Sequence, residues 1–207
     1  MTQAEVAGLS QARRNQLGKA MLELFFYEIY QWGLVQTDPN FGNYLVCSDE
    51  DKDQLVLLDF GSAMCPDGDF LLHLGNVIAA GQARNAEAVA DGLVGLGCLQ
   101  PDAGPEGRRM FADFCLHLLE PLREPSELPP EYLNADGEYC WARSRLMRRA
   151  GKQAAVSAGS RHFTAPSREF AMIARKLSGV FTFIAVLGAE FNAYDIAQRH
   201  IERWLED

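Results

Sequence analysis

The chain has 207 residues, of which 48% are hydrophobic and 23% charged, and its formal net charge at pH 7 is −9. This length allows one sizeable core, so a single soluble globular domain over residues 1–207 is predicted. Nucleic-acid binding requires a basic surface that neutralises phosphates, and here the acidic residues outnumber the basic ones. The charge balance therefore argues against a nucleic-acid partner.

Cysteine usage and the apolar segments bound the compartment. The five cysteines are odd in number and far apart, which predicts reduced thiols and no metal site of Cys/His type. Residues 1–16 lack the apolar core of a secretory signal. The most apolar segment, 177–189, has only 13 uncharged residues, so no membrane span is expected.

In chain order, the first predicted element is a helix over residues 11–33, with Ser10 as its N-cap and Gly33 at its end. Its apolar residues recur with the spacing i, i+3, i+4, i+7 of an amphipathic helix: Leu22, Phe25, Phe26 and Ile29. Two short apolar runs follow, residues 43–47 and 54–60, joined by the polar connector SDEDKD. These runs predict a small β-hairpin.

From residue 70 onward the pattern is helical, and no further strand is expected. The predicted helices cover residues 70–80, 84–97, 105–120, 138–155, 167–187 and 193–205. The fold class is therefore mainly α with one small β-hairpin.

Two short motifs flank this hairpin. The loop QTDPNFGNYLV, residues 36–46, places Asp38 and Asn43 five residues apart, and the triplet Asp59, Phe60 and Gly61 opens the loop 59–68. Each motif alone is a common turn. Together and in this order they match the catalytic core of the protein-kinase fold, in which the first Asp accepts or orients the attacking hydroxyl while the Asn and the second Asp hold Mg²⁺.

The chemistry of these residues is consistent with that assignment. Mg²⁺ is a hard cation that prefers carboxylate, amide and phosphate oxygens, so Asn43 and Asp59 are the predicted metal ligands. Gly61 is expected to let the backbone turn sharply after Phe60.

The motifs QTDPNFGNYLV and LVLLDFGSA, with the preceding helix and residues 166–191, resemble the UbiB family of atypical kinase-like proteins, the aarF-domain-containing kinases of ubiquinone biosynthesis. Gln36, Thr37 and Asn40 stand where an ordinary protein kinase has His, Arg and Lys. The resemblance implies ATP and Mg²⁺ as cofactors, an ATPase or small-molecule phosphotransfer activity, and a mitochondrial location, with the cytoplasm as the alternative.

The same resemblance implies a role for each motif residue. Asp38 is the expected base or water-orienting residue, and Asn43 and Asp59 are the metal ligands. Phe60 and Gly61 help to position the bound nucleotide.

Only 37 residues precede Asp38, too few for the five-stranded N-terminal lobe of a kinase. The expected fold is a kinase-like C-lobe with the N-lobe absent, made of the catalytic loop 36–46, the loop 59–68 and C-terminal helices within 70–207. Two hypotheses follow. The chain is part of an atypical kinase that is weakly active or inactive alone, or it is a non-catalytic pseudokinase lobe that acts as an interaction module.

The expected partners are a nucleotide, a missing N-lobe, quinone-biosynthesis proteins and an anionic membrane surface. The membrane surface is suggested by a basic cluster: Arg143, Arg145, Arg148, Arg149 and Lys152. A solvated helix face is the favoured interpretation of this cluster. The acidic hairpin tip is interpreted as a solubilising turn rather than a metal site: Asp49, Glu50, Asp51 and Asp53.

Overall fold

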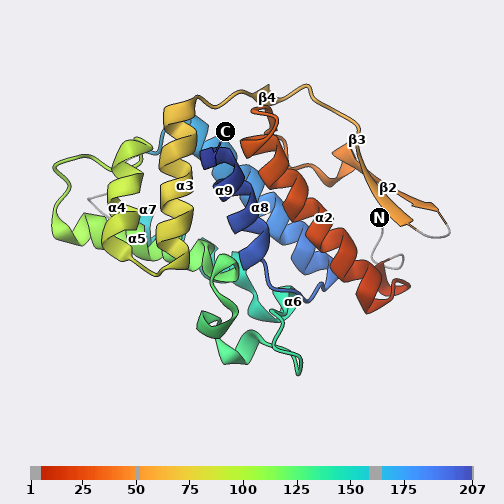
Figure 1. Ribbon diagram of the computed structural model, residues 1–207. Coiled ribbons are helices and arrows are strands. Elements are labelled where there is room, and N and C mark those ends of the chain that lie inside the picture. Colours follow the sequence, from red (N-terminus) through yellow and green to blue (C-terminus); the bar gives the residue numbers. More distant parts are fainter. Residues whose placement is uncertain (1–5, 50–51, 159–164, 207) are drawn as a thin grey trace.

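The computed structural model describes residues 6–49, 52–158 and 165–206 (Figure 1). The helices are α2 (Gln11–Tyr30), α3 (Gly68–Gln82), α4 (Ala86–Gly95), α5 (Pro105–Leu118), α6 (Trp141–Ser144), α7 (Leu146–Ala158), α8 (Arg168–Leu187) and α9 (Tyr194–Glu206). The strands are β1 (Val35–Gln36), β2 (Tyr44–Asp49), β3 (Lys52–Leu57) and β4 (Ala63–Met64), and the short 3-10 helices are η1 (Phe41–Asn43), η2 (Glu120–Leu122), η3 (Pro125–Glu127) and η4 (Pro130–Tyr132). The fold is the predicted one, mainly α with a small hairpin.

The first long helix begins where the sequence predicts. The Ser10 side chain accepts a hydrogen bond from the Arg13 backbone N–H at 3.3 Å, which satisfies one of the free donors of the first turn of α2. The helix ends at Tyr30, and Gly33, with a φ of +60°, lies in the turn that follows. That turn directs the chain into β1 and the first motif.

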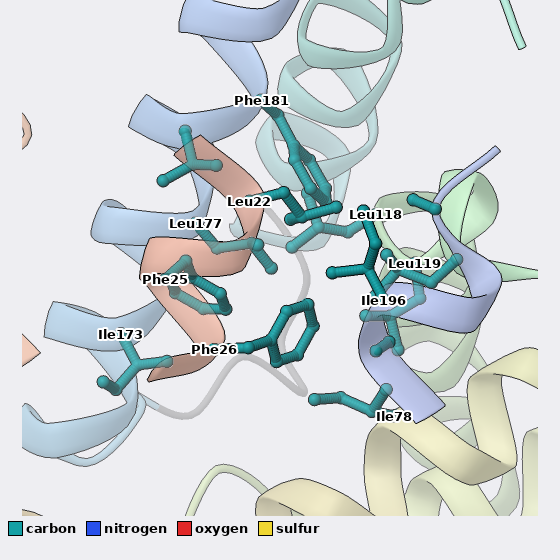
Figure 2. Close-up of a cluster of buried hydrophobic side chains, with 14 of the residues drawn as sticks. Leu22, Phe25, Phe26, Ile78, Leu118, Leu119, Ile173, Leu177, Phe181 and Ile196 are labelled. Atoms are coloured by element: carbon teal, nitrogen blue, oxygen red, sulfur yellow. The ribbon is translucent and has the colours of Figure 1, made fainter. Parts of the chain in front are cut away.

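Helix α2 packs against α8 and α9 in the centre of the molecule. In Figure 1 the β2–β3 hairpin lies on one side of these three helices, and α3, α4 and α5 lie on the other. Figure 2 shows the shared core, to which five helices and the residue after α5 contribute: Leu22, Phe25, Phe26, Ile78, Leu118, Leu119, Ile173, Leu177, Phe181 and Ile196. Burying each large apolar side chain contributes about 1.5–3 kcal/mol, so this cluster holds α2 and α8 in fixed relation.

The β-structure confirms the hairpin and corrects the expectation that no other strand exists. Strands β2 and β3 pair antiparallel, with Tyr44 opposite Leu57. A second small sheet pairs β1 with β4, with Gln36 opposite Ala63. Its two-residue strands are too short to carry a hydrophobic alternation, which is why the sequence did not reveal them. The described part of the chain contains no five-stranded sheet.

The helix predicted over residues 138–155 is two helices, α6 and α7. Arg145 separates them in the left-handed conformation, with a φ of 48°. Nothing in the residue type at this position signals a break, because Arg is a good helix former.

By length and composition, helix α8 is long and apolar enough to span a membrane. This corrects the expectation that no segment of the chain is apolar enough over that length. In this fold its buried stripe packs against α2. Such a stripe is typical of a core helix.

Candidate functional site

The two motif loops are tied together by backbone bonds. Thr37, next to Asp38, donates its backbone N–H to the Ser62 carbonyl oxygen at 2.8 Å, and the two hydroxyl oxygens lie 2.8 Å apart. These bonds extend the β1–β4 pairing. The segment just before Asp38 and the segment just after Gly61 therefore lie side by side.

The hairpin brings the two predicted metal ligands to the same end. Asn43 directly precedes β2, and its carbonyl oxygen accepts a hydrogen bond from the Leu58 backbone N–H at 2.9 Å. Asp59 is the next residue along the chain. Asn43 and Asp59 thus flank the open end of the hairpin.

The Asp38 carboxylate has two side-chain contacts. Its Oδ2 accepts a hydrogen bond from Asn43 Nδ2 at 3.1 Å, and its Oδ1 lies 3.3 Å from an Arg175 guanidinium nitrogen. The Asp38 side chain is held by these two contacts but remains 37% exposed. Arg175, which comes from α8, is a site residue that the sequence analysis missed.

The oxygen atoms of Asn43 and Asp59 fit a hard cation. Asn43 is only 8% exposed, and its Nδ2 donates to Asp38, so its Oδ1 is the atom that could face a cation. Asp59 is exposed; its Oδ1 accepts the Gly61 backbone N–H at 2.7 Å, so its Oδ2 is the second available oxygen. Amide and carboxylate oxygens are what Mg²⁺ prefers, with phosphate and water completing its octahedron.

No cluster of three or more His, Cys, Asp or Glu side chains suited to a metal ion is found in the described ranges. A magnesium site here therefore has to rest on one Asn, one Asp and the oxygens of a ligand.

The backbone bends at Gly61, where the sharp turn was predicted, and Gly61 also supports Asp59. Its φ is not positive, but a Cβ at this position would lie 3.0 Å from Asp59 Oδ1. The absence of a side chain therefore keeps room for the turn that Asp59 makes with its own backbone. Phe60 is 52% exposed, and its positioning role stays a prediction.

The first motif loop packs against helix α8. A Cβ on Gly179 would lie 2.2 Å from the Cβ of Pro39, so only glycine allows the loop to approach the helix this closely. The rings of Phe41 and Phe183 meet edge to face, with centroids 5.6 Å apart.

A buried lysine lies under the same loop. The Lys176 side chain is 1% exposed and pairs with Glu28 of α2 at 3.1 Å. Its Nζ also donates to Gln36 Oε1 at 3.2 Å and to the Tyr44 hydroxyl at 2.8 Å. Burial lowers the pKa of Lys176 and raises the pKa of Glu28, and the attraction between the two charges opposes both shifts.

This pair was not predicted from the sequence, although a signal was present. Lys176 interrupts the apolar stripe of α8 beside Ile173 and Leu177, and Glu28 stands between Phe25 and Ile29 on α2. A charged residue within an apolar stripe indicates a buried partner.

The basic cluster is only partly the solvated face that was predicted. Arg149 is half-buried, donates to Glu120 at 2.6 and 2.9 Å, and stacks 4.5 Å above the Tyr132 ring. Arg143 donates to the Leu133 carbonyl at 3.0 Å. The remaining basic residues are exposed and line a concavity of about 760 Å³: Arg145, Arg148 and Lys152.

The acidic hairpin tip also needs a correction. Asp53 pairs with Arg13 of α2 at 2.6 Å, so it tethers the hairpin to the helix rather than serving solubility alone. The Asp49 backbone ends β2, while Glu50 and Asp51 lie outside the described residues.

Comparison with known proteins agrees with the motif geometry. Residues 2–92 match the ABC1 atypical kinase-like domain, a range that holds both motif loops. The chain is 29% identical over 198 residues to the mitochondrial atypical kinase COQ8B of Rattus norvegicus, which covers 95% of this chain and 35% of the relative. It is also 29% identical over 187 residues to the mitochondrial atypical kinase COQ8 of Schizosaccharomyces pombe, covering 90% of this chain and 29% of the relative.

A further relative is the probable serine/threonine-protein kinase abkA of Dictyostelium discoideum, 26% identical over 89% of this chain and 31% of the relative. The chain thus spans about a third of the length of the curated relatives it matches. The segment that holds both motifs is thus similar to the ABC1 atypical kinase-like domain, and most of the chain is similar to COQ8-type atypical kinases.

Proposed function

We propose that this chain forms the magnesium side of a nucleotide site in an atypical kinase that binds Mg-ATP and acts as an ATPase or small-molecule phosphotransferase in support of ubiquinone biosynthesis. The observation that carries the proposal is the geometry at the open end of the hairpin. There the Asn43 carbonyl accepts the backbone N–H of Leu58, the residue before Asp59, and Asn43 Nδ2 donates to Asp38. Asp38 orients or deprotonates the attacking hydroxyl or water. Asn43 and Asp59 hold Mg²⁺ against the phosphates.

Phosphoryl transfer depends on positioning and charge neutralisation more than on covalent chemistry. The chain supplies the base and the metal ligands. In the described residues, no strand-rich lobe lies over the motif loops. We propose that an N-terminal lobe, in the same or another polypeptide, covers the nucleotide, and that the 207-residue chain alone is weakly active or inactive.

The test is Mg²⁺-dependent nucleotide binding and phosphate release from Mg-ATP by the purified chain, with and without an added N-terminal lobe from a COQ8-type relative. Asp59→Asn keeps the shape and removes the charge, so binding should weaken about a hundredfold and the gain from the lobe should vanish. Asp102→Asn makes the same charge change at an exposed turn and should behave as the wild type. Equal nucleotide affinity in Asp59→Asn and Asp102→Asn would contradict the site.

A second candidate function is a non-catalytic interaction module. Four apolar side chains near the motif loops are exposed, which favours a protein partner on this face: Phe41, Leu45, Leu58 and Phe60. Binding of the added lobe that is unaffected by Mg-ATP and by Asp59→Asn would support this function over the enzymatic one.

The proposed location is the mitochondrion, as the names of two relatives state for those proteins. We also propose an anionic membrane surface as a partner for the exposed residues Arg145, Arg148 and Lys152. Sedimentation with vesicles of anionic or zwitterionic lipid tests it. Retention on the anionic vesicles alone, lost in Arg148→Gln/Lys152→Gln, supports it.

A further inference from the structure

We propose that Lys176 is a positioning residue of the nucleotide site, which it organises from beneath without touching substrate. The inference rests on the proposed function and deepens it. It also adds a second residue of α8 to the site, far beyond the residues 2–92 that match the family domain.

Lys176 contacts the first motif loop on both sides of Asp38 and Asn43. Gln36 begins the loop two residues before Asp38, and Tyr44 immediately follows Asn43. Lys176 Nζ donates to the Gln36 side chain at 3.2 Å and to the Tyr44 hydroxyl at 2.8 Å. One ammonium group thus fixes the separation of the two residues between which Asp38 and Asn43 are held.

Each of the three N–H donors of Lys176 has an acceptor. A lysine ammonium has three N–H donors, and here the acceptors are Glu28, Gln36 and Tyr44. Glu28 Oε2 also accepts the Gln36 backbone N–H at 3.1 Å. Glu28 therefore orients both the lysine and the start of the loop.

Packing alone does not explain a charged pair at this position. Taking two charges out of water carries a large desolvation cost, and well-packed apolar residues of similar volume often hold two helices together as well or better. An apolar pair would join α2 to α8 but would leave Gln36 and Tyr44 without these bonds. What the ion pair adds is a fixed loop.

Two neighbours of Lys176 on α8 contact the same loop. Arg175 lies 3.3 Å from Asp38, and Pro39 packs closely against Gly179. Consecutive turns of α8 thus contact the loop, through Arg175 at Asp38 and through Gly179 at Pro39. A shift of α8 would therefore move Asp38.

The test uses the double variant Lys176→Met/Glu28→Gln, which removes both charges together and keeps the side-chain volumes. Tyr44→Phe is a milder variant that removes one acceptor and keeps the ring. Tyr132→Phe is the matched control, since it removes a tyrosine hydroxyl in η4, which is distant from the motif loop along the chain.

The first readout is amide hydrogen exchange, which needs no nucleotide. The Thr37 N–H bonds to Ser62 and the Asn43 N–H to Asn40, so both report on the loop, while the Leu119 N–H bonds to Cys115 at the end of α5. The double variant should exchange about tenfold faster or more at Thr37 and Asn43, with Leu119 unchanged. Tyr44→Phe should show a smaller increase, greatest at Asn43.

The second readout is the affinity for Mg-ATP, which should fall about tenfold in the double variant and stay at the wild-type value in Tyr132→Phe. Unchanged exchange at Thr37 and Asn43 in the double variant overturns the proposal, and so does equal acceleration at Leu119, because that marks general destabilisation. If the double variant does not fold, Tyr44→Phe decides by the same criteria.

The two proposals fail in different ways. Faster loop exchange together with a wild-type chain that binds no Mg-ATP supports the loop clamp and contradicts the nucleotide site. Nucleotide binding that depends on Asp59 but not on Tyr44, Lys176 or Glu28 supports the site and overturns the positioning role.

Discussion

Two ion pairs in this chain differ in the solvent exposure of their side chains. The side chains of Lys176 and Glu28, beneath the first motif loop, are each 1% exposed. Those of Arg149 and Glu120, in the distal half, are 24% and 5% exposed. Burial dominates in the first pair, so the pKa of Lys176 is lowered and that of Glu28 is raised.

In the second pair the partners outweigh burial. Burial alone would raise the pKa of Glu120, but hydrogen bonds from Arg149 and from the Tyr139 hydroxyl lower it overall. The hydrogen bond with Glu120 likewise raises the pKa of Arg149. The distal pair joins η2 to α7 through favourable contacts, whereas the pair under the loop places charge where water is excluded.

The difference separates a stabilising contact from a geometric one. A pair that is partly open to water keeps much of its solvation and contributes to folding. A fully dry pair contributes little to stability, and its value lies in the groups it orients, here Gln36 and Tyr44. Breaking each pair in a controlled way tests this distinction.

The largest expected effect is that of Lys176→Met alone. It leaves Glu28 buried without its charge partner, so the free energy of unfolding should fall by about 3–5 kcal/mol in urea titrations. Lys176→Met/Glu28→Gln leaves no unpaired charge and should recover most of that loss. A double variant as unstable as the single one would show that the pair itself, rather than its unpairing, stabilises the fold.

A steric change should perturb the same loop without altering any charge. Gly179→Ala places a Cβ against Pro39, so the free energy of unfolding should fall by about 1–3 kcal/mol and nucleotide affinity should fall with it. The matched control is Gly151→Ala in α7, where nothing lies within 4 Å of the added Cβ. That variant should be stabilised by about 0.5–1 kcal/mol, because alanine is the better helix former.

Breaking the distal pair should have a comparable or smaller effect on stability and none on the nucleotide. Arg149→Met leaves Glu120 without its main donor, at a cost of about 1–3 kcal/mol in the free energy of unfolding. Arg148→Met, one residue earlier and exposed, should change stability by less than about 0.5 kcal/mol. Loss of Mg-ATP affinity in Arg149→Met at temperatures where it is folded would contradict the separation of the two regions.

The residues differ in how far the sequence alone could place them. Asp38, Asn43 and Asp59 were predicted because their types and spacing encode oxygen chemistry that is local to one hairpin. The hairpin was predicted because its two runs are long enough to show a pattern. Helix α2 was predicted because its apolar stripe and the cap at Ser10 are local signals.

The missed features depend on contacts between distant segments. Lys176 and Glu28 are 148 residues apart, and no local pattern pairs them. The β1–β4 sheet joins two-residue strands, and the left-handed Arg145 breaks a stretch in which its residue type favours a helix. The basic cluster was read from charge alone, so the insertion of Arg149 between Glu120 and Tyr132 was not foreseen.

The smallest expected effect is a pH dependence confined to the distal region. His117 is half-buried beside Arg149, and burial, reinforced by that positive charge, lowers its pKa below the ordinary value of about 6.5. The unfolded chain therefore binds the proton more readily, so stability from this group is present above about pH 6.5 and is lost as the pH falls. Glu120, whose pKa is also lowered, adds a further loss as the pH falls below about 4.5.

The raised pKa of Glu28 has the opposite sign, because a folded carboxyl that binds its proton more tightly favours the folded state in acid. Acidification from about pH 7.5 to 5.5 should therefore lower the free energy of unfolding by about 1 kcal/mol or less through His117, since the ring is only partly buried. His117→Gln should flatten this part of the profile, measured as the urea midpoint at each pH. The Lys176→Met/Glu28→Gln variant should still lose stability on acidification over the same range, because it leaves His117 and its surroundings unchanged and removes the opposing contribution of Glu28. A slope that survives in His117→Gln but disappears in the double variant would show that the acid sensitivity arises from Lys176 and Glu28. That result would contradict the contrast drawn between the two regions.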